Sequence, residues 1–280
     1  MYTLPGFKGN AVSYIDAHCH IDFEAFDADR GAVLARAGAQ GIRRFLIAGV
    51  SYSHWSRQSR VAATHPGMFC SVGLHPVYLS QLNEAAVLEQ LSGIESLLRS
   101  RGKANTAPVA IGETGLDRVQ ASKSTVPLQL MSLRRHLEWA TRFELPIVLH
   151  CVRAHGLLLD VLSDYKDSLH GGMVHSFSGS VEVMRRYVDL GMYISLSPSV
   201  LRLRSDRFQT LVSGMPWQRF LLESDAPDQP IGGRGRGEPT CILTVAERIS
   251  EIRGCTKDEI LRQSSENCAE LFGAFQPPAV

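Results

Sequence analysis

Eight short apolar runs, spread almost evenly along the chain, constrain its fold more than any other feature. They are YIDAHCH, RRFLIAGV, MFCSVGLHP, PVAIGETGLD, LPIVLHC, GGMVHSF, GMYISLS and RFLLESDAP. Between them, segments such as residues 30–40, 84–100 and 127–143 repeat apolar residues every three or four positions, which is the spacing of a helix with one buried face. Strand and helix therefore alternate, and we expect a parallel sheet with crossover helices.

Eight repeats without a break in composition favour closure of this α/β sheet into a (β/α)8 barrel. A doubly wound open sheet is the alternative, but no G-x-G-x-x-G motif follows the first run to support it. The chain of 280 residues has the size of one such barrel and contains no linker or repeat. We therefore expect one domain over residues 1–280, with two further helices, near 240–250 and 257–273, after the last strand.

The composition of the chain argues against two classes of protein. With 44% apolar residues, 20% charged residues and a net charge of +1, the chain suits neither a disordered protein nor broad non-specific binding of nucleic acid. No C-x-x-C pair is present, and residues 1–12 carry no apolar signal core. We therefore expect reduced thiols and a cytoplasmic protein that does not span a membrane. The cysteines are Cys19, Cys70, Cys151, Cys241, Cys255 and Cys268.

Histidine and carboxylate residues close most of the apolar runs. His18 and His20 end the first run, and because they are two positions apart, both side chains point to the same face of a strand. Glu113 ends the fourth run between two glycines that permit close approach of a ligand. Strand ends form one rim in a barrel. We therefore expect six residues to meet there: His18, His20, Glu113, His150, His175 and Asp225.

Imidazole and carboxylate groups on one rim indicate a metal site. Six such ligands exceed the need of one tetrahedral ion, so we predict two divalent ions, Zn, Mg or Mn, bridged by Glu113. Two adjacent ions lower the pKa of bound water and offset charge on a phosphoryl oxygen, which makes Glu113 and Asp225 the candidate catalytic carboxylates. Asp16, Asp22 and Glu223 are available to accept hydrogen bonds from the histidines.

Other polar residues near the run ends are candidates for substrate contact. His75 could bind metal or substrate, and we favour substrate because the six ligands already fill two sites. Arg153 could hold a phosphate or only balance surface charge. Arg234 and Arg236, on a glycine-rich loop, could reach a polyanion or be solvated. The histidines on predicted helices or their ends we interpret as surface residues: His54, His65, His136 and His170.

The ordered motifs resemble the TatD family of metal-dependent deoxyribonucleases. DAHCHID, GLHP, IGETGLD, LPIVLHC, VHSFSGS, ESDAPD and the closing SSENCAELFG carry this resemblance along nearly the whole chain. DAPDQP is most similar to the YjjV-type branch. Three positions depart from the common family pattern: Arg118 stands where a tyrosine is usual, Arg153 lies one place later than the usual arginine, and Gly237 replaces an asparagine.

The resemblance implies an amidohydrolase-like barrel that hydrolyses phosphodiester bonds in DNA, as a 3′–5′ exonuclease acting on single strands or 3′ ends. It also implies the same six metal ligands and a substrate-binding His75, with no obligate protein partner. Two alternatives stay open. One is hydrolysis of a cyclic amide, lactone or small phosphoester, although such enzymes often have a modified lysine where Glu113 stands. The other is a non-catalytic metal-binding scaffold.

Overall fold

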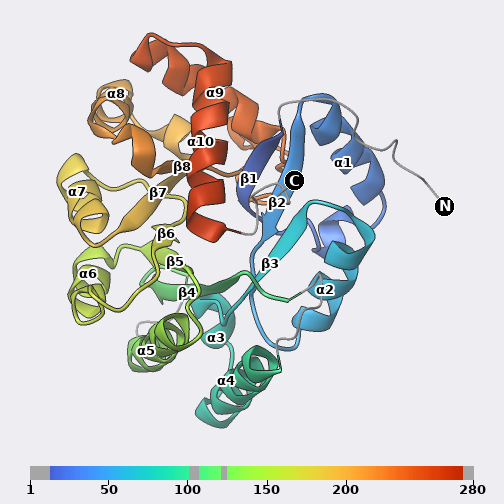
Figure 1. Ribbon diagram of the computed structural model, residues 1–280, viewed down its shortest axis with the longest axis vertical. Helices are drawn as coiled ribbons and strands as arrows, with labels where there is room; N and C mark the ends of the chain where they lie inside the picture. Colours follow the sequence, from blue (N-terminus) through green and yellow to red (C-terminus); the bar gives the residue numbers. More distant parts are fainter. Residues whose placement is uncertain (1–12, 101–106, 121–124, 274–280) are drawn as a thin grey trace.

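The eight apolar runs form eight parallel strands in a computed structural model of the protein, which describes residues 13–100, 107–120 and 125–273. Residues 1–12, where we expect no signal sequence, lie outside these ranges. The order along the sheet follows the chain from β1 to β8 (Figure 1). The strands are β1 Tyr14–Cys19, β2 Ile42–Ile47, β3 Met68–Val72, β4 Ala110–Asp117, β5 Ile147–Val152, β6 Gly172–Val174, β7 Met192–Leu196 and β8 Phe220–Leu222.

Helices follow the strands and surround the sheet (Figure 1), which confirms the predicted (β/α)8 barrel. They are α1 Arg30–Ala39, α2 Trp55–Thr64, α3 Pro76–Leu79, α4 Glu84–Arg99, α5 Val126–Arg142, α6 His155–Ser163, α7 Val181–Asp189, α8 Ser205–Gly214, α9 Cys241–Arg253 and α10 Lys257–Phe272. Within the described ranges, no helix is long and apolar enough to cross a membrane. All six cysteines are free thiols.

The first and last strands meet at a seam that closes the sheet. The backbone N–H of Asp225 donates to the carbonyl of His18 over 3.0 Å, and that of His20 donates to Ala226 over 2.7 Å. These bonds join the end of β1 to the segment after β8. Residues more than 200 positions apart in the sequence are therefore held side by side at the mouth, the end of the barrel at which the strands finish.

The opposite end of the seam is closed by α10, which lies between β1 and β8 in the view of Figure 1. Ser265 accepts a hydrogen bond from the backbone N–H of Ile15, and Ser264 accepts one from Leu222. The two serines thus give the strands at the seam hydrogen-bond partners that buried amides require. Thr256 and Glu259 form a capping box that starts this helix.

Two apolar layers hold the barrel together. One side chain from most strands joins a small cluster with α10, and the alternate strand residues pack in a larger cluster against the surrounding helices. The small cluster contains Ile15, Ala17, Leu46, Ala110, Val148, Met173, Tyr193, Leu221, Cys268 and Phe272. Its members are at most 5% exposed, so this end of the barrel is closed by apolar side chains.

The end of β4 differs from the prediction. We expected Glu113 to end the strand, but β4 continues to Asp117 and pairs with β5 over this extension. The register of that pairing shifts between Ile111 and Thr114. Glu113 therefore lies within the strand, where it is fully buried, and not on an exposed loop.

Candidate metal centre

The six residues expected at the mouth lie together there, with Glu113 at their centre. The two oxygens of its carboxylate face different imidazoles. Oε1 is 2.8 Å from His150 Nδ1 and 3.0 Å from His175 Nε2. Oε2 is 3.2 Å from His18 Nε2 and 3.9 Å from His20 Nε2. One buried side chain thus connects two groups of histidines.

Asp225 completes the group on the β1 side. Its Oδ1 lies 3.6 Å from the Nε2 atoms of both His18 and His20. Ligand atoms of three sets lie within 4.8 Å of one another and could hold an ion: His18, His20 and Asp225; His18, Glu113 and His175; His75, Glu113 and His150. The sets overlap at His18 and Glu113, so a single connected site runs across the mouth.

His75 belongs to this site more closely than the sequence indicated. It follows β3, and its Nε2 is 3.1 Å from Glu113 Oε1 while its Nδ1 accepts a hydrogen bond from the backbone N–H of Val77. Its ring packs edge-on against that of His150, with centroids 4.5 Å apart. The geometry therefore makes His75 a candidate ligand as well as a candidate for substrate contact.

Two groups, Glu113 and His20, have the protonation state that metal ligands require. Burial alone would raise the pKa of Glu113, but the imidazoles of His75, His175 and His18 hold it well below its ordinary value. Burial, with the neighbouring His18, holds the pKa of His20 well below its ordinary value. The centre thus contains an ionised carboxylate and a neutral imidazole, the forms that coordinate cations.

Two imidazoles have the opposite shift. Burial alone would lower the pKa of His150, but Asp117 and Glu113 raise it above its ordinary value. Burial would also lower the pKa of His175, yet Glu113 and Glu223 hold it well above. These two imidazoles therefore hold a proton more strongly than an ordinary histidine does.

Unpartnered atoms test whether the residues fit a metal ion. Both ring nitrogens of His18, Nδ1 of His20 and Oε2 of Glu113 are buried without a hydrogen-bond partner in the described part of the chain. Buried polar atoms are normally satisfied, because leaving one unpaired costs about 1–3 kcal/mol. Imidazole nitrogen and carboxylate oxygen are the donors that divalent zinc and manganese accept. The donor set therefore fits divalent cations.

Carboxylates behind the imidazoles orient two of them. Asp117 Oδ2 lies 3.1 Å from His150 Nε2, so the other ring nitrogen of His150 faces Glu113. Glu223 Oε1 lies 3.3 Å from His175 Nδ1 in the same way. We expected this role for Glu223 and missed it for Asp117. A signal was present, because Asp117 is four residues after Glu113 and shares its strand face.

The other expected acceptors bind different partners. Asp16 accepts hydrogen bonds from the hydroxyl and the backbone N–H of Ser224, over 2.5 and 2.9 Å, and so ties β1 to the segment after β8. Burial raises the pKa of Asp16 to about 7, against these hydrogen bonds. Asp22 Oδ2 lies 2.8 Å from Nε2 of His54. Neither carboxylate accepts a hydrogen bond from an imidazole of the centre.

Comparison with known proteins identifies the family. Residues 15–273 match the family described as TatD related DNase. The chain belongs to this TatD family. The match runs from β1 to the end of α10, so it includes every residue of the centre and confirms the resemblance found in the motifs.

Individual TatD-family relatives match over most of their length. The chain is 32% identical to the metal-dependent hydrolase YjjV of Escherichia coli over 92% of this chain and 97% of that protein. It is 30% identical to the 3′–5′ ssDNA/RNA exonuclease TatD of Cronobacter sakazakii, over 94% and 99% respectively. The crystal structure of YjjV superposes with a TM-score of 0.82, at 30% identity, over 93% of this chain and 98% of that one.

The arginines considered for substrate contact lie in different surroundings in this TatD-family protein. Arg153 is exposed between β5 and α6, with a left-handed backbone φ of 52°. Arg236 forms a bidentate ion pair with Asp29, over 2.8 and 2.7 Å, and lies over the ring of Phe26. Arg234 is exposed on the same loop. Of the three arginines, Arg236 is the one whose side chain is held in place by contacts within the fold.

One histidine interpreted as a surface residue is in fact buried. His136 of α5 is 0% exposed, and its Nε2 accepts a hydrogen bond from the backbone N–H of Leu74 while its Nδ1 donates to the carbonyl of Ser132. Burial lowers the pKa of His136 to about 4. The prediction was wrong because His136 shares the apolar face of α5 with Leu133 and Leu137.

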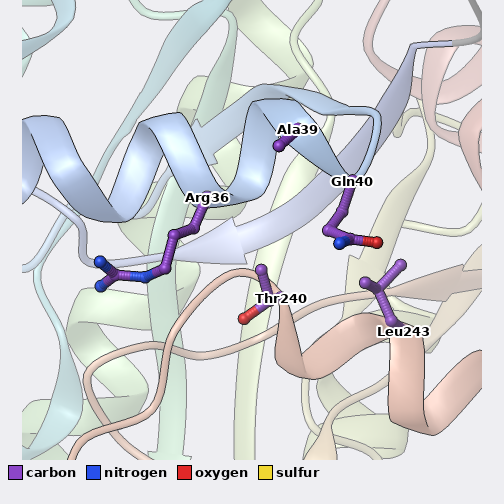
Figure 2. A pocket seen from close by; sticks show the side chains of 5 residues that line it. All are labelled: Arg36, Ala39, Gln40, Thr240 and Leu243. Carbon is purple, nitrogen blue, oxygen red and sulfur yellow. The ribbon is translucent and has the colours of Figure 1, made fainter.

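A surface pocket of about 430 Å³ lies away from the centre, between α1 and the start of α9 (Figure 2). Arg36, Ala39, Gln40, Thr240 and Leu243 line it. None of these side chains is a candidate ligand, and Arg36 is paired with Glu238 over 2.8 Å. The candidate metal ligands therefore lie at the mouth and not at this pocket.

Proposed function

We propose that this TatD-family protein is a two-metal phosphodiesterase that removes nucleotides from the 3′ end of single-stranded DNA. The observation that carries the proposal is the division of the Glu113 carboxylate between two groups of imidazoles. A carboxylate that presents one oxygen to each group has the arrangement required to bridge two cations.

The candidate ligands divide around this bridge. His18, His20 and Asp225 would hold one ion with Glu113 Oε2. His150 and His175, whose Nδ1 and Nε2 atoms lie 3.1 Å apart, would hold the other with Glu113 Oε1, and His75 lies within reach of the same oxygen. Two divalent ions, Zn, Mg or Mn, would supply a nucleophile from water at neutral pH and would offset charge on the phosphoryl group.

Asp225 is assigned as the proton acceptor. Burial raises its pKa to about 6, against the opposing effect of His175 and His18. A carboxylate whose pKa lies near the working pH is suited to accept a proton from attacking water. Oδ1 is the oxygen that faces the imidazoles of β1, so Asp225 would lie beside an ion held there and beside the water that this ion binds.

Nucleic acid is the substrate that the relatives support, since the TatD protein of Cronobacter sakazakii is named an exonuclease of single-stranded DNA and RNA. Arg153 is exposed next to the end of β5 and could contact a phosphate from there. The overall charge of +1 provides little attraction for long DNA. We therefore expect a short binding region with little sequence preference, in which activity falls as salt concentration rises.

The test is hydrolysis of labelled single-stranded DNA with added Mg²⁺, Mn²⁺ or Zn²⁺, with RNA and duplex DNA compared. A phosphorothioate at the 3′-terminal linkage should block degradation, and the same group at the 5′ end should not. Asp225→Ala should remove activity, whereas Asp228→Ala, on the exposed part of the same loop, should retain it. Equal cleavage by the Asp225→Ala protein would contradict the proposal.

The other functions have distinct outcomes in the same assay. Hydrolysis of a lactone, a cyclic amide or a small phosphoester, with no cleavage of DNA, would support the amidohydrolase-type alternative. Bound metal without turnover of any substrate would support a scaffold.

A further inference from the structure

We propose that Gln229 is a positioning residue that fixes Asp225 for the ion on the β1 side of the centre. Gln229 lies four residues after Asp225, in the loop that follows β8, and is partly buried. Its carboxamide is connected to the segments after β6 and β7 as well as to Asp225. The inference rests on the proposed role of Asp225 as a metal ligand.

The hydrogen bonds decide which way the carboxamide points. Gln229 Oε1 accepts a bond from the backbone N–H of Ser199 over 2.9 Å and from the hydroxyl of Ser197 over 2.6 Å. Because a backbone N–H can only donate, the atom facing it must be the oxygen. The NH2 group therefore points the other way, where it donates to Ser176 Oγ over 2.9 Å and to Asp225 Oδ2.

This contact leaves one oxygen of Asp225 for a cation. Oδ2 accepts the hydrogen bond from Gln229, while Oδ1 faces His18 and His20 at 3.6 Å from each. Without the amide, the carboxylate could rotate and exchange its two oxygens. Gln229 thus sets both the direction of Asp225 and the oxygen that it presents.

The backbone conformation of the residues around Gln229 supports this positioning role. Ser176, Asp225 and Gln229 have φ values of 48°, 53° and 56°, in the left-handed region that residues other than glycine rarely adopt. Such conformations persist where surrounding contacts fix them, and they gather at functional sites. These three residues are joined by the hydrogen bonds of the Gln229 carboxamide.

Among the candidate ligands, the side chain of Gln229 contacts Asp225 directly, on the β1 side of the centre. Its link to the other side is indirect, through Ser176, whose backbone N–H donates to Glu223. On the other side, His150 and His175 have their own carboxylates, Asp117 and Glu223. In the described part of the chain, the side chain of Gln229 hydrogen-bonds to none of these four. We therefore expect its removal to weaken one ion and to spare the other.

The experiment measures metal binding to Gln229→Ala protein. Protein freed of metal by a chelator is titrated with Zn²⁺ against a chromogenic competitor, and bound zinc is counted by elemental analysis. Wild-type protein should bind two ions. The variant should bind one with wild-type affinity and the other about 10- to 100-fold more weakly. Gln81→Ala, the same change at an exposed loop position, should bind as wild type does.

Three outcomes would overturn the inference. Unchanged binding of both ions by Gln229→Ala would show that the amide does not position Asp225. Equal weakening of both ions would contradict a one-sided role. If the alanine variant fails to fold, Gln229→Met retains the length of the side chain without the donor, and wild-type binding there would be equally decisive. Wild-type protein that takes up no zinc would instead contradict the proposed function itself.

Discussion

The two ends of the barrel bury different kinds of side chain, apolar at one end and polar or charged at the other. At the sealed end, side chains such as Leu46, Val148 and Leu221 pack with Phe272 of α10, and all are at most 5% exposed. At the mouth, equally buried positions carry charged or polar groups that lack partners. Every buried side-chain nitrogen or oxygen without a hydrogen bond in the described ranges belongs to β1, β4 or the loop after β1, except Nε of Arg253.

Because of this difference, one end of the barrel stabilises the fold and the other end carries the candidate site. Apolar burial stabilises a barrel by about 25 cal/mol for each Å² removed from water, whereas an unpaired buried polar group costs about 1–3 kcal/mol. The sealed end therefore supports the fold, and the mouth opposes it until cations bind. Variants at the two ends should have different effects, which the following predictions test in order of decreasing size.

The largest effect should follow from Glu113→Gln. The amide keeps the shape of the side chain but cannot present an anionic oxygen to both groups of imidazoles. We expect kcat/KM to fall on the order of 10,000-fold, as for other residues that act as part of one catalytic unit. Bound metal should fall from two ions towards none, measured by elemental analysis. Glu89→Gln, on the exposed face of α4, is the matched control. Full activity in the Glu113→Gln protein would remove the central element of the proposed site.

Leu221→Ala tests the sealed end. Leu221 is 0% exposed within the small apolar cluster, so its truncation should leave a cavity and lower the free energy of unfolding by about 3 kcal/mol. The mouth should be unaffected, so kcat/KM per folded molecule should stay near the wild-type value. Urea unfolding and a nuclease assay on the same preparation give both quantities. A loss of activity without a loss of stability would show that the two ends are coupled.

The sequence was sufficient for the barrel because its signals are local. Apolar runs with helical segments between them identify all eight strands, and a spacing of two residues places His18 and His20 on one face. Glu113, His150 and His175 were found for the same reason, since each lies in or directly after a run. Local pattern and fold agree wherever one element alone decides the position of a side chain.

Contacts between distant segments could not be predicted in the same way. Arg236 pairs with Asp29, 207 positions away, and nothing near either residue indicates the partner. The amide of Gln229 depends on two serines that follow β7, so its role emerges only in three dimensions. The surface position predicted for His136 was wrong for a different reason. The prediction followed its polar residue type and not the apolar helix face on which it lies.

His136 gives a contrast with the imidazoles of the mouth, because its two ring nitrogens are already satisfied without a cation. Burial lowers its pKa from 6.5 to about 4 in the folded protein. The unfolded chain therefore takes up a proton that the folded chain does not, between these two values. The contribution is fully present above pH 6.5 and is lost as the pH falls towards 4.

We expect this one group to account for a loss of about 2 kcal/mol between pH 7 and pH 5. His136→Gln offers an acceptor to Leu74 but does not titrate, so its stability should fall less over the same interval. The difference between the two urea unfolding curves isolates His136 from the titrating groups of the mouth. Parallel loss of stability in both proteins would show that the imidazole is protonated in the folded state.

The smallest effect should follow from Asp117→Asn, which replaces one carboxylate oxygen by an NH2 group on the β5 side of the mouth. Burial alone would raise the pKa of Asp117, but hydrogen bonds from His150 and from the backbone N–H groups of Val119 and Gln120 bring it to about 2. The carboxylate is therefore ionised and accepts the Nε2–H of His150. Nδ1 faces Glu113 and is then the nitrogen that would bind a cation on this side.

Asparagine can keep the bonds to Val119 and Gln120 through its oxygen, but its NH2 group then faces His150 and selects the other tautomer. The proton would move to Nδ1, where a cation should bind. We expect about tenfold lower kcat/KM and weaker binding of the ion on this side only. Gln229→Ala, by contrast, is expected to weaken only the ion on the β1 side. If both variants weakened the same ion, the assignment of Asp117 and Gln229 to opposite sides of Glu113 would be wrong.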